Sequence, residues 1–244
     1  MEIQPSSSVR RFCIWSAASS FTFSLLYITG QVAKWLDLFG FEIATAQAPY
    51  TTGTGYMVNE YMVLLLSALL QAITFTILII GIYHCTTKEK KIWSHVALVF
   101  ALIYTVLISI NYCLQFTFIV PYLATLYVEG DFSTALDSLL YSVNMLGYSF
   151  LSLSVFFVAF IFSGEKPARL AQGFLFANSL TLPFLILQNF YPISVWPSVW
   201  WAITFLGSTF SLLVFFIKIA TKTSQAKVPK QIIMLDKRII YHNN

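Results

Sequence analysis

Long apolar stretches divided by short polar gaps restrict this chain more than any other feature. A membrane-spanning helix needs about 20 mostly apolar residues. Six stretches meet that length, at residues 12–33, 60–84, 92–118, 138–163, 169–190 and 196–218. The chain is 58% hydrophobic and only 10% charged, with a mean hydropathy of +0.75. These values are outside the range of soluble domains. The sequence therefore predicts an all-α integral membrane protein, a bundle of six transmembrane helices.

The basic residues are confined to every second gap between these stretches. Of the 14 Lys and Arg residues, only Lys34 falls in one of the other gaps. The rest are Arg10, Arg11, Lys88, Lys90, Lys91, Lys166, Arg169, Lys218, Lys222, Lys227, Lys230, Lys237 and Arg238. Because cytoplasmic loops collect Lys and Arg, this alternation predicts that both termini are cytoplasmic. We expect a multi-pass protein of the cell membrane.

Three segments follow from this topology. Residues 1–11 are the expected cytoplasmic N-terminus, residues 12–218 the membrane domain, and residues 219–244 a basic cytoplasmic tail. The net charge of +4 is explained by the topology signal and by a tail near anionic lipid headgroups. No basic stripe with interleaved aromatic residues lies outside the stretches, so nucleic acid is not an expected partner. The bilayer is the expected environment.

Uncharged polar residues recur at helical spacing inside the apolar stretches, while charged side chains are missing near their centres. In residues 92–118, Tyr104, Asn111 and Gln115 step by seven and four, which places them on one helix face. Such faces should turn inward, because an unpaired amide in hydrocarbon costs several kcal/mol. The predicted ligand-binding residues are Gln71, Tyr104, Asn111, Gln115, Tyr141, Asn144, Tyr148, Asn178 and Gln188.

These polar stripes have two interpretations. Interhelical hydrogen bonds of about 0.6–2 kcal/mol hold membrane helices together, so the stripes can be structural. Alternatively, most of the amides fall towards the outer side, which favours an outward-facing polar cavity with uncharged walls. Pro121 is expected to end or bend the third stretch, and Pro183 to bend the fifth, because proline frees a backbone carbonyl.

Catalytic and metal-binding signatures are missing from the sequence. The three histidines lie at stretch ends or in the tail, and no motif of a hydrolase, a metalloprotease or a phosphate-binding loop occurs. We expect no cofactor and no metal. The three cysteines give no disulfide framework; Cys13 and Cys85 near the cytoplasmic face are interpreted as small apolar residues, with acylation as the alternative.

Three functions remain, and no family resemblance selects among them. The first is binding or transport of a small neutral or weakly polar molecule in the polar cavity, with the chain acting alone or as a substrate-binding subunit. The second is a structural or accessory membrane protein, whose amides join helices and whose basic tail contacts lipid, a protein partner or a second copy. The third is a lipid-modifying enzyme, which the missing catalytic motif disfavours.

Overall fold

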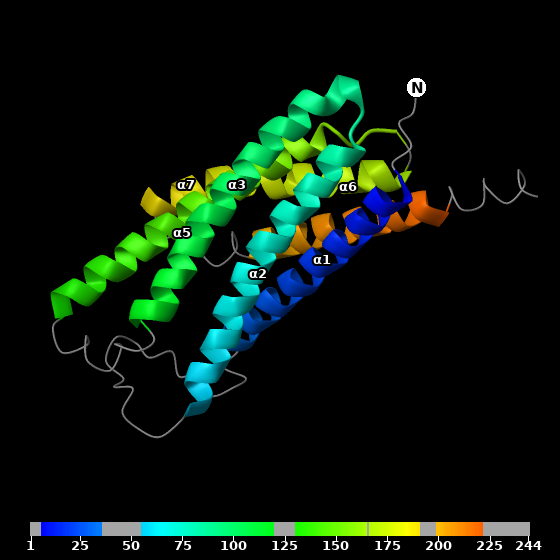
Figure 1. Ribbon diagram of the computed structural model, residues 1–244. Helices are drawn as coiled ribbons and strands as arrows, with labels where there is room; N and C mark the ends of the chain where they lie inside the picture. The colour runs from blue at the N-terminus through cyan, green and yellow to red at the C-terminus, as the bar shows by residue number, and fades with distance from the viewer. Residues whose placement is uncertain (1–5, 36–54, 120–129, 165, 191–198, 222–244) are drawn as a thin grey trace, which may run out of the picture.

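The computed structural model describes residues 6–35, 55–119, 130–164, 166–190 and 199–221 (Figure 1). Near some helix ends only the backbone is described: residues 33–35, 55–62, 118–119, 130–137 and 186–190. Apart from short turns, the secondary structure in these ranges is helical, without a strand. The predicted basic tail after residue 221 and the outer loop at 36–54 lie outside the described residues.

The helices follow the apolar stretches closely. They are α1 (Ser7–Trp35), α2 (Gly55–Cys85), the short 3-10 helix η1 (Lys88–Lys90), α3 (Lys91–Leu114), the π-helical turn η2 (Gln115–Ile119), α5 (Gly130–Ala159), α6 (Lys166–Ser179), α7 (Thr181–Phe190) and a last helix, Val199–Thr221. Five segments of the described chain are long and apolar enough to cross a membrane: Ser7–Val32, Val63–Cys85, Lys88–Thr117, Ser138–Ala159 and Val199–Thr221. The chain is therefore an all-helical protein with the properties of a membrane protein.

Individual residues explain where α1 and α6 begin and where the chain turns after α5. The Ser6 hydroxyl accepts a hydrogen bond from the backbone N–H of Val9 at 3.3 Å, which satisfies one of the free donors at the start of α1. Gly164, with φ of 107°, turns the chain between α5 and α6. Pro167 then occupies the first turn of α6, where its missing N–H costs nothing.

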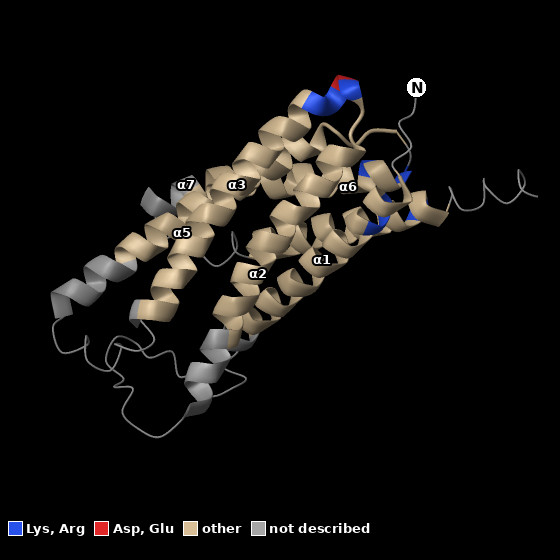
Figure 2. Ribbon diagram, viewed as in Figure 1, with Lys and Arg blue, Asp and Glu red and all other residues tan. Residues whose placement is uncertain are grey.

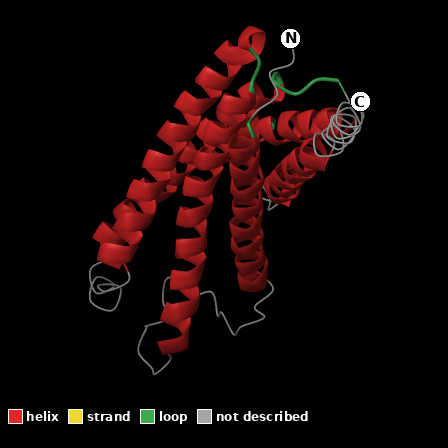
Figure 3. Cartoon of the chain, turned by 45° about the vertical axis from the view of Figure 1, so that its right-hand side comes forward, coloured by secondary structure: helices red, strands yellow, loops and turns green. Residues whose placement is uncertain are grey.

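Helices adjacent in sequence pack side by side, so that α1 contacts α2, α2 contacts α3, α3 contacts α5, and α5 contacts α6 (Figures 1 and 3). The last helix contacts α1 through the rings of Phe21 and Phe210, 5.6 Å apart, and the segment just after α5 through Phe162 and Phe215, 5.1 Å apart. It approaches α6 so closely that a Cβ at Gly207 would overlap the ring of Phe174. The last helix therefore closes the bundle against both its first and its later helices.

The fifth predicted stretch is two helices rather than one. Helix α6 ends at Ser179 and α7 begins at Thr181, with a turn at Leu180. Pro183 explains the position of this break, because it has no N–H to donate to the carbonyl four residues earlier, which belongs to Ser179. Neither α6 nor α7 is long enough alone to be one of the five candidate spans.

The basic residues gather at one end of the bundle (Figure 2). Those with described side chains are Arg10, Arg11, Lys88, Lys90, Lys91, Lys166, Arg169 and Lys218. Lys34, of which only the backbone is described, is near the other end of α1. Two contacts fix this end. Arg10 Nη1 donates to the carbonyl of Ala220 at 3.3 Å, and Lys90 Nζ donates to the carbonyl of Ile161 at 2.9 Å, just beyond the end of α5. The start of α1 and the end of the last helix thus lie together.

Candidate functional site

A buried hydrogen bond joins α2 to α3 near the middle of both helices. The Tyr104 hydroxyl donates to Gln71 Oε1 at 2.9 Å, and both residues are at most 1% exposed. The second polar atom of the amide, Gln71 Nε2, is buried without a protein partner. Helical periodicity had placed both side chains on inward faces, and the structure brings them into contact.

Aromatic rings surround this pair. The Tyr104 ring packs edge-to-face on Phe75, with centroids 6.0 Å apart, and lies 6.0 Å from the ring of Tyr148 on α5. Trp201 of the last helix packs edge-on against Tyr148 at 5.1 Å and against Tyr27 of α1 at 6.1 Å. Five helices thus contribute to one aromatic cluster. Such edge-to-face pairs stabilise packing beyond the area that they bury.

Tyrosine hydroxyls connect this cluster to the amides. The Tyr148 hydroxyl donates to the Tyr27 hydroxyl at 3.4 Å, and Tyr27 also accepts a hydrogen bond from Gln31 Nε2 at 3.1 Å. Tyr112 on α3 interacts with the hydroxyls of both Tyr27 and Tyr148. The result is a continuous polar network through α1, α3 and α5, made without a charged side chain.

A second pair of amides links α3 to α5. Asn111 Nδ2 donates to Asn144 Oδ1 at 3.4 Å, close to the upper limit for a hydrogen bond. Asn111 is 1% exposed, and its Oδ1 has no partner. Directly after this turn of α3 the backbone becomes the π-helical η2, which begins at Gln115. Single π-helical turns are frequently found at functional sites of helical proteins.

Asn178 lies at the end of α6, next to the break at Leu180, rather than with the other amides. Its Nδ2 donates to Thr204 Oγ1 of the last helix at 3.0 Å, while its Oδ1 and the nearby Thr181 Oγ1 are buried without partners. The indole of Trp200 donates to the carbonyl of Ala177 at 3.0 Å. Side chains of the last helix therefore satisfy part of the backbone and side-chain polarity at the broken helix.

The remaining predicted site residues have different surroundings. Tyr141 is 44% exposed, and the side chains of Gln115 and Asn144 are half-buried. The side chain of Gln188 lies outside the described residues. The residues that the structure brings together are thus Gln71 with Tyr104 and Tyr148, and Asn111 with Asn144.

Four contributors to the network were not among the predicted site residues: Tyr27, Gln31, Tyr112 and Trp201. Tyr27 shares a helix face with Ser24 and Gln31 by their spacing, but that spacing does not show which other helix the face meets. Trp201 looks like an interfacial tryptophan by sequence. It nevertheless precedes Thr204 by three residues and Ser208 by seven, which is the helical spacing that continues the polar stripe of the last helix.

The network contains uncharged hydrogen-bond donors and acceptors that have no protein partner. Gln71 Nε2 and Trp201 Nε1 are donors, Asn111 Oδ1 is an acceptor, and all three are buried without protein partners. Among the described residues there is no group of three or more His, Cys, Asp or Glu side chains that can hold a metal ion. The chemistry offered here is hydrogen bonding and aromatic contact with an uncharged group.

Comparison of the chain with protein-family models, curated proteins and solved structures finds no match. The functional assignment therefore depends on the geometry of these residues.

Proposed function

We propose that this chain is a multi-pass membrane protein that binds a small neutral or weakly polar molecule at the aromatic–amide network, as a transport protein or as the substrate-binding subunit of one. The observation that carries the proposal is the set of unpartnered atoms, Gln71 Nε2, Asn111 Oδ1 and Trp201 Nε1. A buried polar group without a hydrogen bond costs about 1–3 kcal/mol. A ligand with one acceptor and one donor offsets part of that cost.

The surroundings of these atoms indicate the kind of ligand. The rings of Tyr148 and Trp201 provide apolar faces, and charged side chains are missing from the network. An ion would be desolvated here without a countercharge, which is strongly unfavourable. A planar or partly apolar molecule that carries a carbonyl and a hydroxyl or amide group fits the available contacts.

The proposal includes six membrane segments, with α6 and α7 together forming a broken fifth one, and both termini cytoplasmic. Two observations support it. The start of α1 contacts the end of the last helix through Arg10 and Ala220, as an even number of crossings requires. The basic residues whose side chains are described all lie at that same end (Figure 2), which the positive-inside rule assigns to the cytoplasm. Fusion of a compartment-specific reporter to each terminus tests this orientation.

The binding proposal is tested by mass spectrometry of molecules that co-purify with the protein in mild detergent, combined with a thermal-shift screen of neutral metabolites and lipids. We expect a compound that raises the melting temperature of the wild type. Asn111→Ala combined with Gln115→Leu, and separately Gln71→Leu, should remove the shift. Thr86→Val is a matched control, because Thr86 is buried just beyond α2 at the basic end and its hydroxyl donates to the Ile82 carbonyl of α2, away from the network.

A structural or accessory role is the second candidate, and a different set of contacts favours it. Ser154 Oγ of α5 donates to the Ala97 carbonyl of α3 at 2.8 Å, and Thr105 Oγ1 of α3 donates to the Ala72 carbonyl of α2 at 3.1 Å. These bonds join helices without involving the network. If the Asn111/Gln115 and Gln71 variants lose detergent stability and no compound shifts the wild type, the amides join helices and the binding proposal is wrong.

A further inference from the structure

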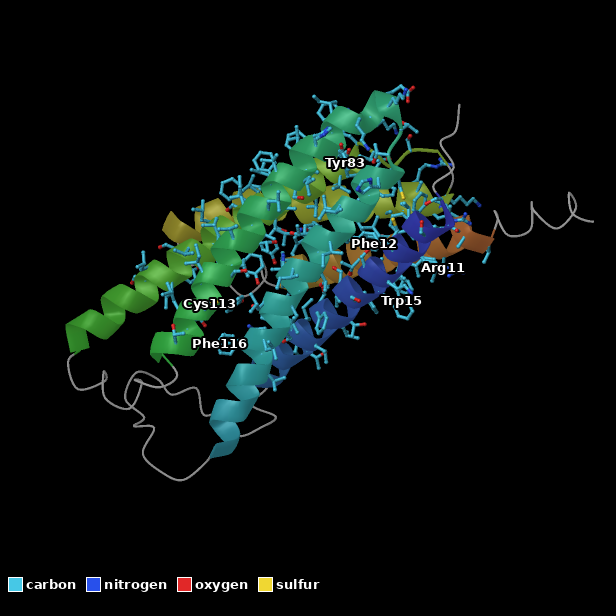
Figure 4. All side chains as sticks on the ribbon, in the orientation of Figure 1. Arg11, Phe12, Trp15, Tyr83, Cys113 and Phe116 are labelled. Atoms are coloured by element: carbon cyan, nitrogen blue, oxygen red, sulfur yellow. The ribbon has the colours of Figure 1, made fainter. Side chains whose placement is uncertain are left out.

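Two cysteines from separate helices meet at the basic end of the bundle. Cys13 lies on α1, and Cys85 is the last residue of α2. Their Sγ atoms are 3.2 Å apart, and neither cysteine forms a disulfide. The two positions are 72 residues apart in the chain. The contact therefore exists only because α1 and α2 fold against each other. Figure 4 labels Arg11 and Phe12, the neighbours of Cys13 in sequence, at this end.

Gly81 explains why the sulfur atoms come so close. Gly81 precedes Cys85 by four residues, so both lie on the same face of α2. A Cβ built at Gly81 would lie 3.0 Å from Cys13 Sγ and 3.4 Å from Cδ1 of Phe12. The missing side chain thus lets α1 approach α2 one helical turn before Cys85.

The two thiols differ in access and in their electrostatic surroundings. Cys13 is 0% exposed, whereas Cys85 is half-buried. Lys91 and Arg10 both act electrostatically on Cys85. Lys91 Nζ is held in place by the Tyr83 carbonyl and lies 3.6 Å from the centre of the Tyr83 ring. Nearby cations favour the thiolate, which is the nucleophilic form of cysteine.

We propose that Cys13 and Cys85 are a redox-active dithiol, which a low-molecular-weight disulfide such as glutathione disulfide converts into a covalent link between α1 and α2. The Cys85 thiolate attacks one sulfur of the disulfide, forms a mixed disulfide and releases one thiolate. Cys13 then attacks the Cys85 sulfur and releases the second. The two protein protons end on the two released thiols, so two protein thiols and one disulfide give one protein disulfide and two thiols.

The test uses the full chain, purified in mild detergent and fully reduced, then incubated in glutathione buffers of increasing oxidised fraction. Intact mass and peptide mapping follow the products. We expect one glutathione disulfide consumed per chain and a Cys13–Cys85 cross-linked peptide. Cys113→Ser is the matched control and should oxidise like the wild type, because Cys113 is exposed near the opposite end of α3 (Figure 4).

Single variants separate the roles of the two thiols. Cys13→Ser should stop at a glutathione adduct on Cys85, because no second thiol is adjacent to resolve it. Cys85→Ser should leave the buried Cys13 without a glutathione adduct, because the accessible thiol that starts the exchange is missing. Gly81→Ala keeps both thiols but pushes Cys13 away, and we expect it to slow the cross-link by about fivefold or more, since disulfide formation has strict geometry.

Several outcomes overturn the proposal. Modification of Cys113 alone, or a mixture of cross-links that includes Cys113, means that the native contact does not direct the chemistry. A cross-link that forms equally fast in the folded and in the urea-unfolded wild-type protein also means that the native contact does not direct the chemistry. The variants are compared only after gel filtration and melting temperature show that each is folded, so misfolding is not mistaken for lost reactivity.

Discussion

The Tyr104 hydroxyl donates to Gln71 Oε1 at 2.9 Å, and this bond joins two buried side chains of the neighbouring helices α3 and α2. Removing either partner leaves the other buried without its bond. We expect Tyr104→Phe and Gln71→Leu each to lower the free energy of unfolding by about 1–2 kcal/mol. The double variant should lose less than the sum, because neither unpaired group remains. A double-mutant cycle in mixed detergent micelles measures this, and strictly additive losses would show that the bond contributes nothing.

The close contact between α6 and the last helix gives a second prediction. A Cβ at Gly207 overlaps the Phe174 ring, whereas a Cβ at Gly173 meets no atom within 4 Å. Gly207→Ala should therefore destabilise the protein by about 1–3 kcal/mol through overpacking. Gly173→Ala should leave stability unchanged or raise it by up to about 1 kcal/mol, because alanine favours the helix. Thermal unfolding of the two variants compares them, and similar melting temperatures would contradict this packing.

The break at Leu180 gives a third prediction. Pro183→Ala supplies an N–H that can bond to the Ser179 carbonyl, so α6 and α7 should join more continuously. We expect slower amide hydrogen exchange across residues 178–186, measured by mass spectrometry. Pro167→Ala is the control, because Pro167 lies in the first turn of α6, where an added N–H gains no helical partner. Equal exchange in the wild type and Pro183→Ala would exclude proline as the cause of the break.

Lys90 gives a fourth prediction at the basic end. Its Nζ donates to the Ile161 carbonyl at 2.9 Å and also to the Ser163 hydroxyl, which satisfies polar groups just beyond α5. Lys90→Met should cost about 0.5–1.5 kcal/mol. Lys88→Met, in the same short helix, should change stability by less. Chemical unfolding measures the free energy of unfolding of both variants. A greater loss of stability for Lys88→Met would show that the Lys90 contacts are not the stabilising ones.

The positions of the helices could be predicted because apolar length is a local property of the sequence. The described parts of the apolar stretches are mostly helix, and five of the described segments have the length and hydropathy of membrane spans. The fifth stretch shows the limit of this argument. Pro183 indicates a bend, but hydropathy does not show that the helix ends at Ser179 and restarts at Thr181. At the break, Asn178 and Ala177 form hydrogen bonds with the last helix, a tertiary contact that hydropathy does not show.

The candidate site could be predicted only one helix at a time. Helical spacing placed Gln71, Tyr104 and Asn111 on inward faces, and all three are buried. Which faces meet is a tertiary property, so the pairing of Gln71 with Tyr104 could not be derived from spacing. Trp201 was missed because tryptophan near a predicted boundary usually lies at the membrane interface. Cys13 and Cys85 meet for a similar tertiary reason, through the approach of α1 at Gly81.

Helix α6 has 14 residues, which correspond to about 21 Å and fall short of a hydrocarbon layer of about 30 Å. It also carries Lys166, Arg169 and Asn178. Such a segment enters the bilayer poorly during synthesis by itself. Its hydrogen bonds to Trp200 and Thr204 supply the missing stabilisation only once the last helix has been made. Under the proposed six-segment topology we therefore expect α6 to enter the lipid only together with the last helix, after the ribosome has completed that helix.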